Sequence, residues 1–364
     1  MKKFYTIIIV SFMMIMFIAR SAFAEPIKWQ MITCWIPSMA VSESDKRFAK
    51  SVYELSGGRL QITVNSAGTI VPALSVFDAV SRGVAEIGSD SPAYWSGKNS
   101  AFDLLGSFPT ALSQYDVFNW YFHSGGHDLY NYMYGKYNML YFITSVAPMG
   151  SGIRSRQPIR TLADFRGKKL RMSGKAQGYI LQKLGAAQLM MAGGDIYQAL
   201  QMGTIDGAEF SCPSIDWSLG LGDVTKYNIG PGWNQPATVF GIMINRDAWY
   251  KLPSDLKRIV EFAANDNMIY MSSYYEAKNG AALSLFRDKG TETYRLSPRD
   301  MKQLEDWSWE YIVVEAQRNE DYDKVATSIV QYLKDFRVTR TSEEPFAHGR
   351  NPAVVPRLPH LVGR

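Results

Sequence analysis

The stretch that decides the fold is residues 27–88, IKWQMITCWIPSMAVSESDKRFAKSVYELSGGRLQITVNSAGTIVPALSVFDAVSRGVAEIG. Segments that alternate apolar and polar side chains predict strands, and apolar side chains at helical spacing predict helices between them. Ser42 is the expected N-cap of the first helix, and Gly57-Gly58 is its expected end. The strands are predicted at residues 27–33, 60–64 and 85–88, and the helices at 42–55 and 73–83. This order predicts an α/β fold with a parallel sheet wrapped by helices.

A second module with the same rhythm begins after residue 160. Strands are predicted at residues 167–172 and 205–210, helices at 175–184 and 196–202, and mainly helices from Ser254 onward. Two such modules predict two lobes, each a mostly parallel sheet flanked by helices, with a ligand cleft between them. The expected division is lobe I at 25–150 with 236–285, lobe II at 151–235 with 286–335, and a loose proline-rich tail at 343–364.

The N-terminus has the three parts of a secretory signal peptide. MKKFYTIIIVSFMMIMFIARSAFA, residues 1–24, has a basic start, a short apolar run and the small-x-small site Ala22-Phe23-Ala24. The run is shorter than the roughly 20 residues that cross a bilayer, so we expect cleavage after Ala24 and release into the periplasm. The segment also carries three of the five net positive charges of the chain. The small remaining excess argues against nucleic-acid binding.

Several enzyme classes are excluded by motifs that the sequence lacks. His123 and His127 are separated by Ser-Gly-Gly, which is not the helix of a zinc hydrolase. There is no phosphate-binding loop, no G-x-S-x-G elbow and no Cys-x-x-Cys pair. The two cysteines, Cys34 and Cys212, are expected to be small buried thiols, although an oxidising compartment would allow them to pair. The missing catalytic sets favour a binding protein.

Five segments carry a resemblance to a known family. They are DFRGKKLR at 164–171, VFDAVSRG with Glu86-Ile87 at 76–87, AGGDIYQALQMGTIDGAEF at 192–210, YWSGK at 94–98 and GPGW at 230–233. In consistent order over about residues 27–330, they resemble the substrate-binding proteins of TRAP transporters, the DctP-type family. The run at 192–210 is most similar to the subfamily that binds 2-oxo acids such as pyruvate. The resemblance implies a two-lobed periplasmic binding protein fold.

Arg171 is the main candidate for the ligand site. It ends a predicted parallel strand just before a helix, where α/β folds bind ligands, and its guanidinium can hold a carboxylate with two parallel hydrogen bonds. A solvated arginine at a strand end is the alternative that the spacing alone leaves open. The resemblance implies the family's carboxylate-clamping arginine at Arg171, and it places Arg154 near a second family arginine.

Glu209 and Phe210 end the strand predicted at 205–210. The resemblance implies that both line the ligand site and that Glu209 coordinates a metal ion, often sodium, that bridges to the substrate. Two departures from the subfamily pattern count against that ion. Pro148 and Gln235 stand where the subfamily has a glutamine and a glutamate, so a side-chain oxygen and a charge are lost. We therefore expect no cofactor, with sodium or calcium as the alternative that the resemblance implies.

Aromatic side chains supply the other candidate contacts. Trp35, Tyr94, Trp95, Phe210 and Trp233 fall at predicted strand ends or in turns. Packing in the core is the alternative, and it must hold for some of them. An arginine at one end and aromatic rings elsewhere predict a pocket for an organic acid with an apolar or planar body.

These observations predict a periplasmic solute receptor, not an enzyme, that binds a small organic monocarboxylate, a 2-oxo or related acid. The resemblance implies delivery to an integral-membrane TRAP permease, and a homodimer is a further expected association. The alternatives are a secreted enzyme that uses Glu209 as general base and Arg171 as positioner, and a sensory receptor on the same fold. The enzyme would need a second acid or nucleophile, and the sequence shows no convincing one.

Overall fold

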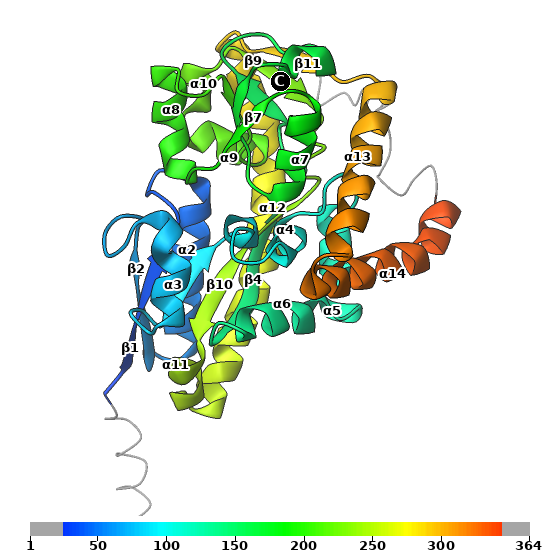
Figure 1. The fold of residues 1–364 in the computed structure, drawn as a ribbon. Coiled ribbons are helices and arrows are strands. Elements are labelled where there is room, and N and C mark those ends of the chain that lie inside the picture. The colour runs from blue at the N-terminus through cyan, green and yellow to red at the C-terminus, as the bar shows by residue number, and fades with distance from the viewer. Residues whose placement is uncertain (1–24, 344–364) are drawn as a thin grey trace, which may run out of the picture.

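The computed structural model describes residues 25–343. The predicted signal peptide at 1–24, and the tail beyond Glu343, lie outside the described residues. Two sheets organise the chain, each with helices on its faces (Figure 1). None of the described helices combines the length and apolar character needed to span a membrane.

The first sheet forms the centre of what we call lobe I. Its strand order is β2 (Leu60–Asn65), β1 (Ile27–Thr33), β3 (Ile87–Asp90), β10 (Thr238–Asn245) and β4 (Met139–Ala147). Only β10 runs against the other strands of this sheet, because it pairs antiparallel with both of its neighbours. This sheet is therefore mostly parallel, as predicted.

Helices cover both faces of the first sheet because strands of a mostly parallel sheet bury both of their faces. One face packs against α2 (Ala40–Leu55) and α12 (Ser254–Asp288) through a core that includes Phe48 and Val260. The other face carries α3 (Val76–Ser81), α4 (Ala101–Gly106), α5 (Gln114–His123) and α6 (Gly126–Gly135), and α11 (Arg246–Lys251) follows β10.

The second sheet forms the centre of lobe II. Its strand order is β11 (Glu292–Arg295), β9 (Tyr227–Gly230), β5 (Ile153–Ser155), β8 (Gly207–Ala208), β6 (Lys169–Arg171) and β7 (Ala187–Leu189). Here β5 alone runs against the others. The helices of this part are α7 (Lys175–Lys183), α8 (Ile196–Met202), α9 (Pro213–Ser218), α10 (Leu221–Val224) and α13 (Pro298–Ala316).

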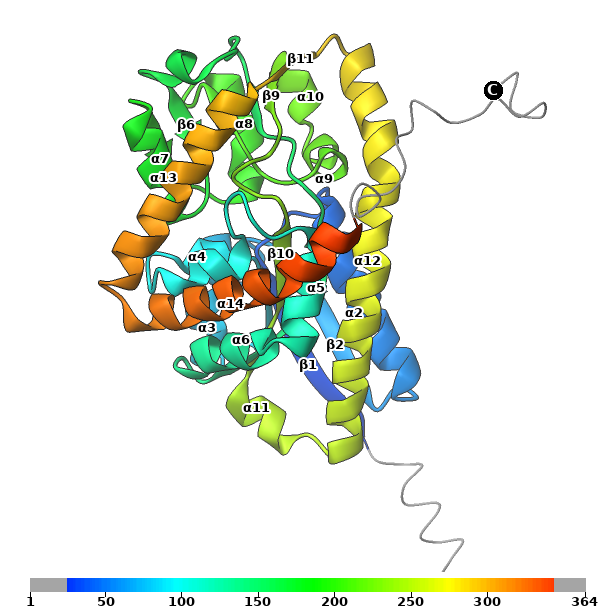
Figure 2. The same ribbon diagram turned by 90° about the vertical axis from the view of Figure 1, so that its right-hand side faces the viewer.

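The chain passes between the two sheets more than once. It leaves lobe I after β4, returns from β9 into β10, and then forms α12, which packs on β4 and α2 in lobe I and on α9 in lobe II. Figure 2 shows α12 in yellow along the side of both lobes. The last helix, α14 (Glu320–Glu343), packs on α13 but also on α4 and α6 of lobe I. The exact lobe boundaries stay a prediction. The packing of α14 on α4 and α6 argues against assigning this helix to lobe II alone.

Most predicted elements are present, and the differences are local. Ser42 is wrong as the N-cap, because the helix begins at Ala40 and the Ser42 hydroxyl donates to the Ile36 carbonyl instead (2.7 Å). The strand predicted at 205–210 is reduced to β8, Gly207–Ala208. Cys34 and Cys212 are both buried free thiols, so the expectation of unpaired cysteines is confirmed.

Candidate functional site

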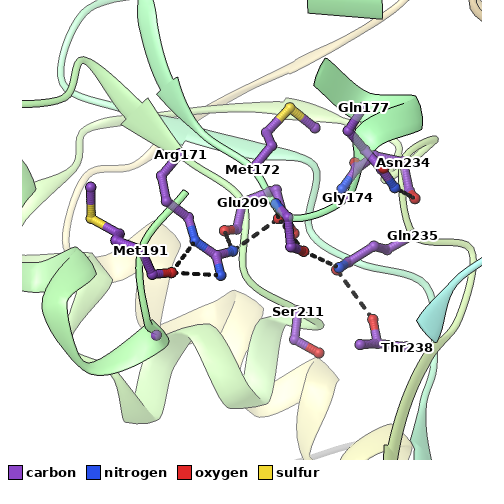
Figure 3. A network of polar contacts seen from close by, with 12 residues as sticks. Arg171, Met172, Gly174, Gln177, Met191, Glu209, Ser211, Asn234, Gln235 and Thr238 are labelled. Carbon is purple, nitrogen blue, oxygen red and sulfur yellow. Dashed lines mark hydrogen bonds and ion pairs between the residues drawn. The ribbon is translucent and has the colours of Figure 1, made fainter. Parts of the chain in front are cut away.

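Arg171 ends strand β6, and α7 begins four residues later at Lys175. Only 1% of the surface of Arg171 is exposed. Its Nε and Nη2 donate to the Met191 carbonyl (3.2 Å each), and its Nη1 donates to the carbonyl and the Oε1 of Glu209 (2.7 and 2.9 Å). A guanidinium has five N–H donors, so these contacts occupy four of them. These contacts therefore fix the orientation of Arg171 and leave one of its N–H groups without a hydrogen bond to the described residues (Figure 3).

Glu209 follows β8 directly and forms a buried ion pair with Arg171. Its Oε1 also accepts hydrogen bonds from the backbone N–H of Ser173 (2.8 Å) and from the Ser173 hydroxyl (3.1 Å). Its Oε2 is buried and accepts no hydrogen bond from any residue in the described part of the chain. Burial raises the pKa of Glu209, while the charge of Arg171 and the Ser173 hydrogen bonds oppose that rise.

A short polar chain extends from Glu209 toward lobe I. The Gln235 amide nitrogen donates to the Ser173 hydroxyl (3.4 Å), and the Gln235 amide oxygen accepts from the Thr238 hydroxyl at the start of β10 (3.1 Å). Figure 3 shows Arg171, Glu209, Gln235 and Thr238 in this order across the site. Two residues after Glu209, the Ser211 hydroxyl is buried and has no hydrogen-bond partner within residues 25–343.

Three of the predicted aromatic residues form one cluster beside this network. Trp35 packs its ring 5.7 Å from that of Tyr94 and 6.4 Å from that of Phe210, between ring centroids. Arg171 lies over the Phe210 ring at 5.5 Å. The half-buried Tyr94 accepts at its hydroxyl from the Gly193 N–H of lobe II (3.0 Å). The structure thus brings together Arg171, Glu209, Phe210, Trp35, Tyr94 and Gln235.

The other three predicted site residues make most of their contacts elsewhere, and Trp95 also packs edge-on against Tyr94, with 6.2 Å between ring centroids. Trp95 packs on Phe77 in the core of lobe I and donates its indole N–H to Asp90. Trp233 packs in the core of lobe II. Arg154 forms a separate buried ion pair with Asp216 (2.9 Å). The contacts of Trp95 and Trp233 match the core-filling alternative for the aromatic residues. The part of all three residues in ligand binding is still a prediction.

Asp103, a residue that sequence reasoning missed, connects the two lobes. It belongs to α4 of lobe I, and its Oδ2 accepts from the backbone N–H groups of Lys175 (2.6 Å) and Ala176 (3.4 Å), which open α7 of lobe II. A carboxylate at a helix N-terminus is favoured by the unpaired N–H groups and the helix dipole. Gly174 precedes α7 with φ 92°, and a Cβ there would lie 2.2 Å from the Gln177 Oε1.

The sequence held only weak signals for the missed residues. Asp103 is the single charge in the apolar run AFDLLG, and Ser173 lies just beyond a predicted strand end. The residues around Asp103 and Ser173 do not indicate their partners, because each contact joins segments that lie far apart in the chain: Asp103 with α7, and Ser173 with Glu209. Thr238 contacts Gln235 only because β10 starts directly after the crossing between the lobes.

The side chains at this site do not fit a tightly held cation. A hard cation needs several oxygen ligands and preferably net negative charge. Glu209 offers one free oxygen and Ser211 offers a neutral hydroxyl, and Arg171 already balances the charge of Glu209. The Gln235 oxygen accepts from Thr238, and Pro148 has no side-chain oxygen.

Comparison with known proteins places the chain in a family. Residues 35–313 match the family described as bacterial extracellular solute-binding protein, family 7. The chain is 30% identical, over 88% of its length and 89% of the relative, to the monocarboxylate 2-oxoacid-binding periplasmic protein of a Nostoc strain.

Solved structures agree with this relationship. A TRAP transporter solute-binding protein from Bordetella bronchiseptica, described with copurified calcium and picolinate, gives a TM-score of 0.83 at 27% identity, covering 88% of this chain and 96% of that one. Another from Pseudoalteromonas atlantica, with bound sodium and pyruvate, gives 0.82 at 28% identity, covering 88% and 100%. The fold is therefore that of the two-lobed periplasmic binding proteins, as predicted. This chain belongs to family 7 of the bacterial extracellular solute-binding proteins, the solute-binding proteins of TRAP transporters.

Proposed function

We propose that this protein is a periplasmic receptor that captures a small organic monocarboxylate, a 2-oxo or related acid, and delivers it to a TRAP-type membrane permease. The observation that carries the proposal is the buried guanidinium of Arg171 at the end of β6, between the aromatic cluster and Glu209. A buried arginine beside apolar rings is suited to an anion with an apolar body.

In this proposal the ligand carboxylate takes the remaining N–H of Arg171 and competes with Glu209 Oε1 for Nη1. Trp35, Tyr94 and Phe210 contact the body of the acid and exclude water from it. Closure of the lobes is stabilised where Tyr94 meets Gly193 and where Asp103 meets α7. A ligand that contacts both lobes favours the closed state by its extra affinity for that state.

The contacts of Glu209 support binding without turnover. A general base needs an accessible carboxylate with a second acid or nucleophile near it. Oε1 of Glu209 is held by Arg171 and Ser173, and no second acid or nucleophile among the described residues lies within hydrogen-bond distance of its free Oε2. We therefore favour the receptor over the enzyme that uses Glu209 as base. A sensory receptor would share this site and differ only in its partner protein.

Export to the periplasm and the association with a permease are parts of the same proposal, and a homodimer stays a prediction. The membership in an extracytoplasmic family and the sequence of residues 1–24 support export. Intact-mass measurement of the exported protein should give a chain that begins at Glu25.

The function can be tested with a thermal-shift screen of small carboxylates against the purified mature protein. A ligand at about 100 times its Kd should stabilise the folded protein by about 2.7 kcal/mol. Proton NMR of the best ligand after prolonged incubation should recover it unchanged. Stabilisation by dicarboxylates alone, or conversion of the ligand into a product, would contradict the proposal.

A further inference from the structure

We infer that, among the monocarboxylates proposed above, this receptor takes a 2-amino acid as its zwitterion, with the carboxylate at Arg171 and the ammonium at Glu209. The inference rests on the proposed function and adds the chemical class of the ligand.

The first observation is the unpaired oxygen of Glu209. This side chain is 2% exposed, and its Oε2 accepts no hydrogen bond from the described residues, while Oε1 accepts from Arg171 and Ser173. A buried carboxylate oxygen without a donor is destabilising, so the site is incomplete without an N–H, an O–H or a cation there. The Gln235 nitrogen donates to the Ser173 hydroxyl, and it makes no hydrogen bond to Glu209 Oε2.

The second observation is the charge balance of the site. Arg171 and Glu209 cancel, and the neighbouring pair of Arg154 and Asp216 cancels as well. A 2-oxo or 2-hydroxy acid would add an uncompensated negative charge to this buried site, which is costly. A zwitterionic amino acid adds no net charge. Its carboxylate would pair with Arg171 and its ammonium with Glu209, so two ion pairs with the ligand replace the one between the two side chains.

The third observation comes from the related structures. The relatives from Bordetella bronchiseptica and Pseudoalteromonas atlantica are described with a carboxylate together with calcium or sodium. The substituted side chains of this chain do not fit such an ion, because Glu209 offers a single free oxygen and Gln235 is neutral. An ammonium one carbon away from the carboxylate brings a positive charge and three N–H donors as part of the ligand itself.

The cluster around the site sets the expected side chain of the amino acid. Trp35 and Phe210 are almost fully buried, and a Cβ on Gly193 would come within 2.4 Å of the Phe210 ring. Close packing of apolar rings favours a short aliphatic side chain over a long or charged one.

The test is calorimetric titration of chelator-treated protein, in buffer free of sodium and calcium, with three acids of one carbon skeleton: 2-aminobutyrate, 2-hydroxybutyrate and 2-oxobutyrate. We expect 2-aminobutyrate to bind about tenfold tighter than either analogue, or more, because only it satisfies Glu209 with a charged donor. Glu209→Gln should reverse this order, since an amide can donate to the keto oxygen and no longer attracts an ammonium. Glu276→Gln, which removes an exposed carboxylate on α12, is the matched control and should leave the order unchanged.

Tighter binding of 2-oxobutyrate or 2-hydroxybutyrate to the wild-type protein under these conditions would overturn the inference and leave the proposed function standing. If none of the three acids nor any other monocarboxylate bound to the folded wild-type protein, the proposed function itself would fail. Should Glu209→Gln not fold, the order of the three acids on the wild-type protein decides alone.

Discussion

Arg171 donates four hydrogen bonds at the site. Its planar group is held from two sides, by the Met191 carbonyl and by Glu209, so it meets a ligand with a fixed orientation. A lysine would carry the same charge without the fork geometry that makes these contacts together. A substitution at position 171 can therefore show whether ligand binding needs only a positive charge or also the planar, forked shape of the guanidinium.

We predict that Arg171→Lys keeps the fold and weakens ligand binding. The lost charge-assisted hydrogen bonds correspond to roughly 1.5–3 kcal/mol, or about a tenfold to hundredfold rise in Kd. Calorimetry of the best ligand measures it, with circular dichroism to confirm folding. Lys169→Arg, at an exposed position of the same strand, is the matched control and should leave the Kd unchanged. Wild-type affinity in folded Arg171→Lys would remove Arg171 from the site.

A second residue-scale feature is the buried carboxyl of Asp45 on α2. Burial raises the pKa of Asp45 to about 8, although a hydrogen bond from Ser89 opposes the rise, and its Oδ2 has no partner among the described residues. The folded protein therefore holds a proton that the unfolded chain, with an ordinary pKa of 3.8, releases.

The proton on Asp45 therefore contributes to the free energy of unfolding at low pH. This contribution is lost as the pH rises from about 4 to about 8. We predict that urea denaturation shows a smaller fall in stability between pH 5 and pH 8 for Asp45→Asn than for the wild-type protein. Equal slopes would show that Asp45 is ionised throughout in the folded protein.

At the scale of elements, the contact between α4 and the N-terminus of α7 couples the lobes. Burial raises the pKa of Asp103 to about 7, against the opposing effect of the Lys175 and Ala176 N–H groups. The charged or titratable groups that face it are Lys175 of α7, Tyr311 of α13 and Tyr322 of α14. Opening of the lobes would expose Asp103 to water and return its pKa toward 3.8.

Closing should therefore take up a proton between about pH 4 and pH 7, so ligand affinity should fall as the pH rises through this range. We predict a weaker pH dependence of the Kd for Asp103→Asn, which keeps an oxygen for the α7 N–H groups but cannot titrate. Titrations from pH 5 to pH 8 on both proteins measure it. Parallel pH profiles would show that Asp103 stays in one protonation state during closure.

Local patterns predicted the first lobe well, because β1, β2, α2 and β3 are encoded by short-range periodicity. The same reasoning placed Arg171 and Glu209 at the ends of two predicted strands, but it did not predict the ion pair between them. It did not predict β4 or β10, whose side chains are almost all buried and therefore show no alternation. It grouped Trp95 and Trp233 with the site because turn aromatics and core aromatics look alike in a sequence. Both rings pack in the cores of the lobes, and their part in ligand binding stays a prediction.

At the scale of the whole molecule, the two lobes are joined by the crossings at 148–152 and 231–237 and by α12. The second crossing carries Gln235, so the segment that joins the lobes also contributes to the polar network of the site. This arrangement ties the position of the ligand to the relative position of the lobes, as a receptor that closes around its ligand requires.

The central claim is that this chain captures a monocarboxylate with its own side chains and without a bridging ion. The most direct measurement is titration of the best ligand into chelator-treated protein in sodium-free buffer, repeated after sodium or calcium is restored. We predict one-to-one binding with the same Kd in all three conditions, because Arg171 and Glu209 complete the site with the ligand alone. A loss of affinity without the ion that returns when the ion is added back would contradict it.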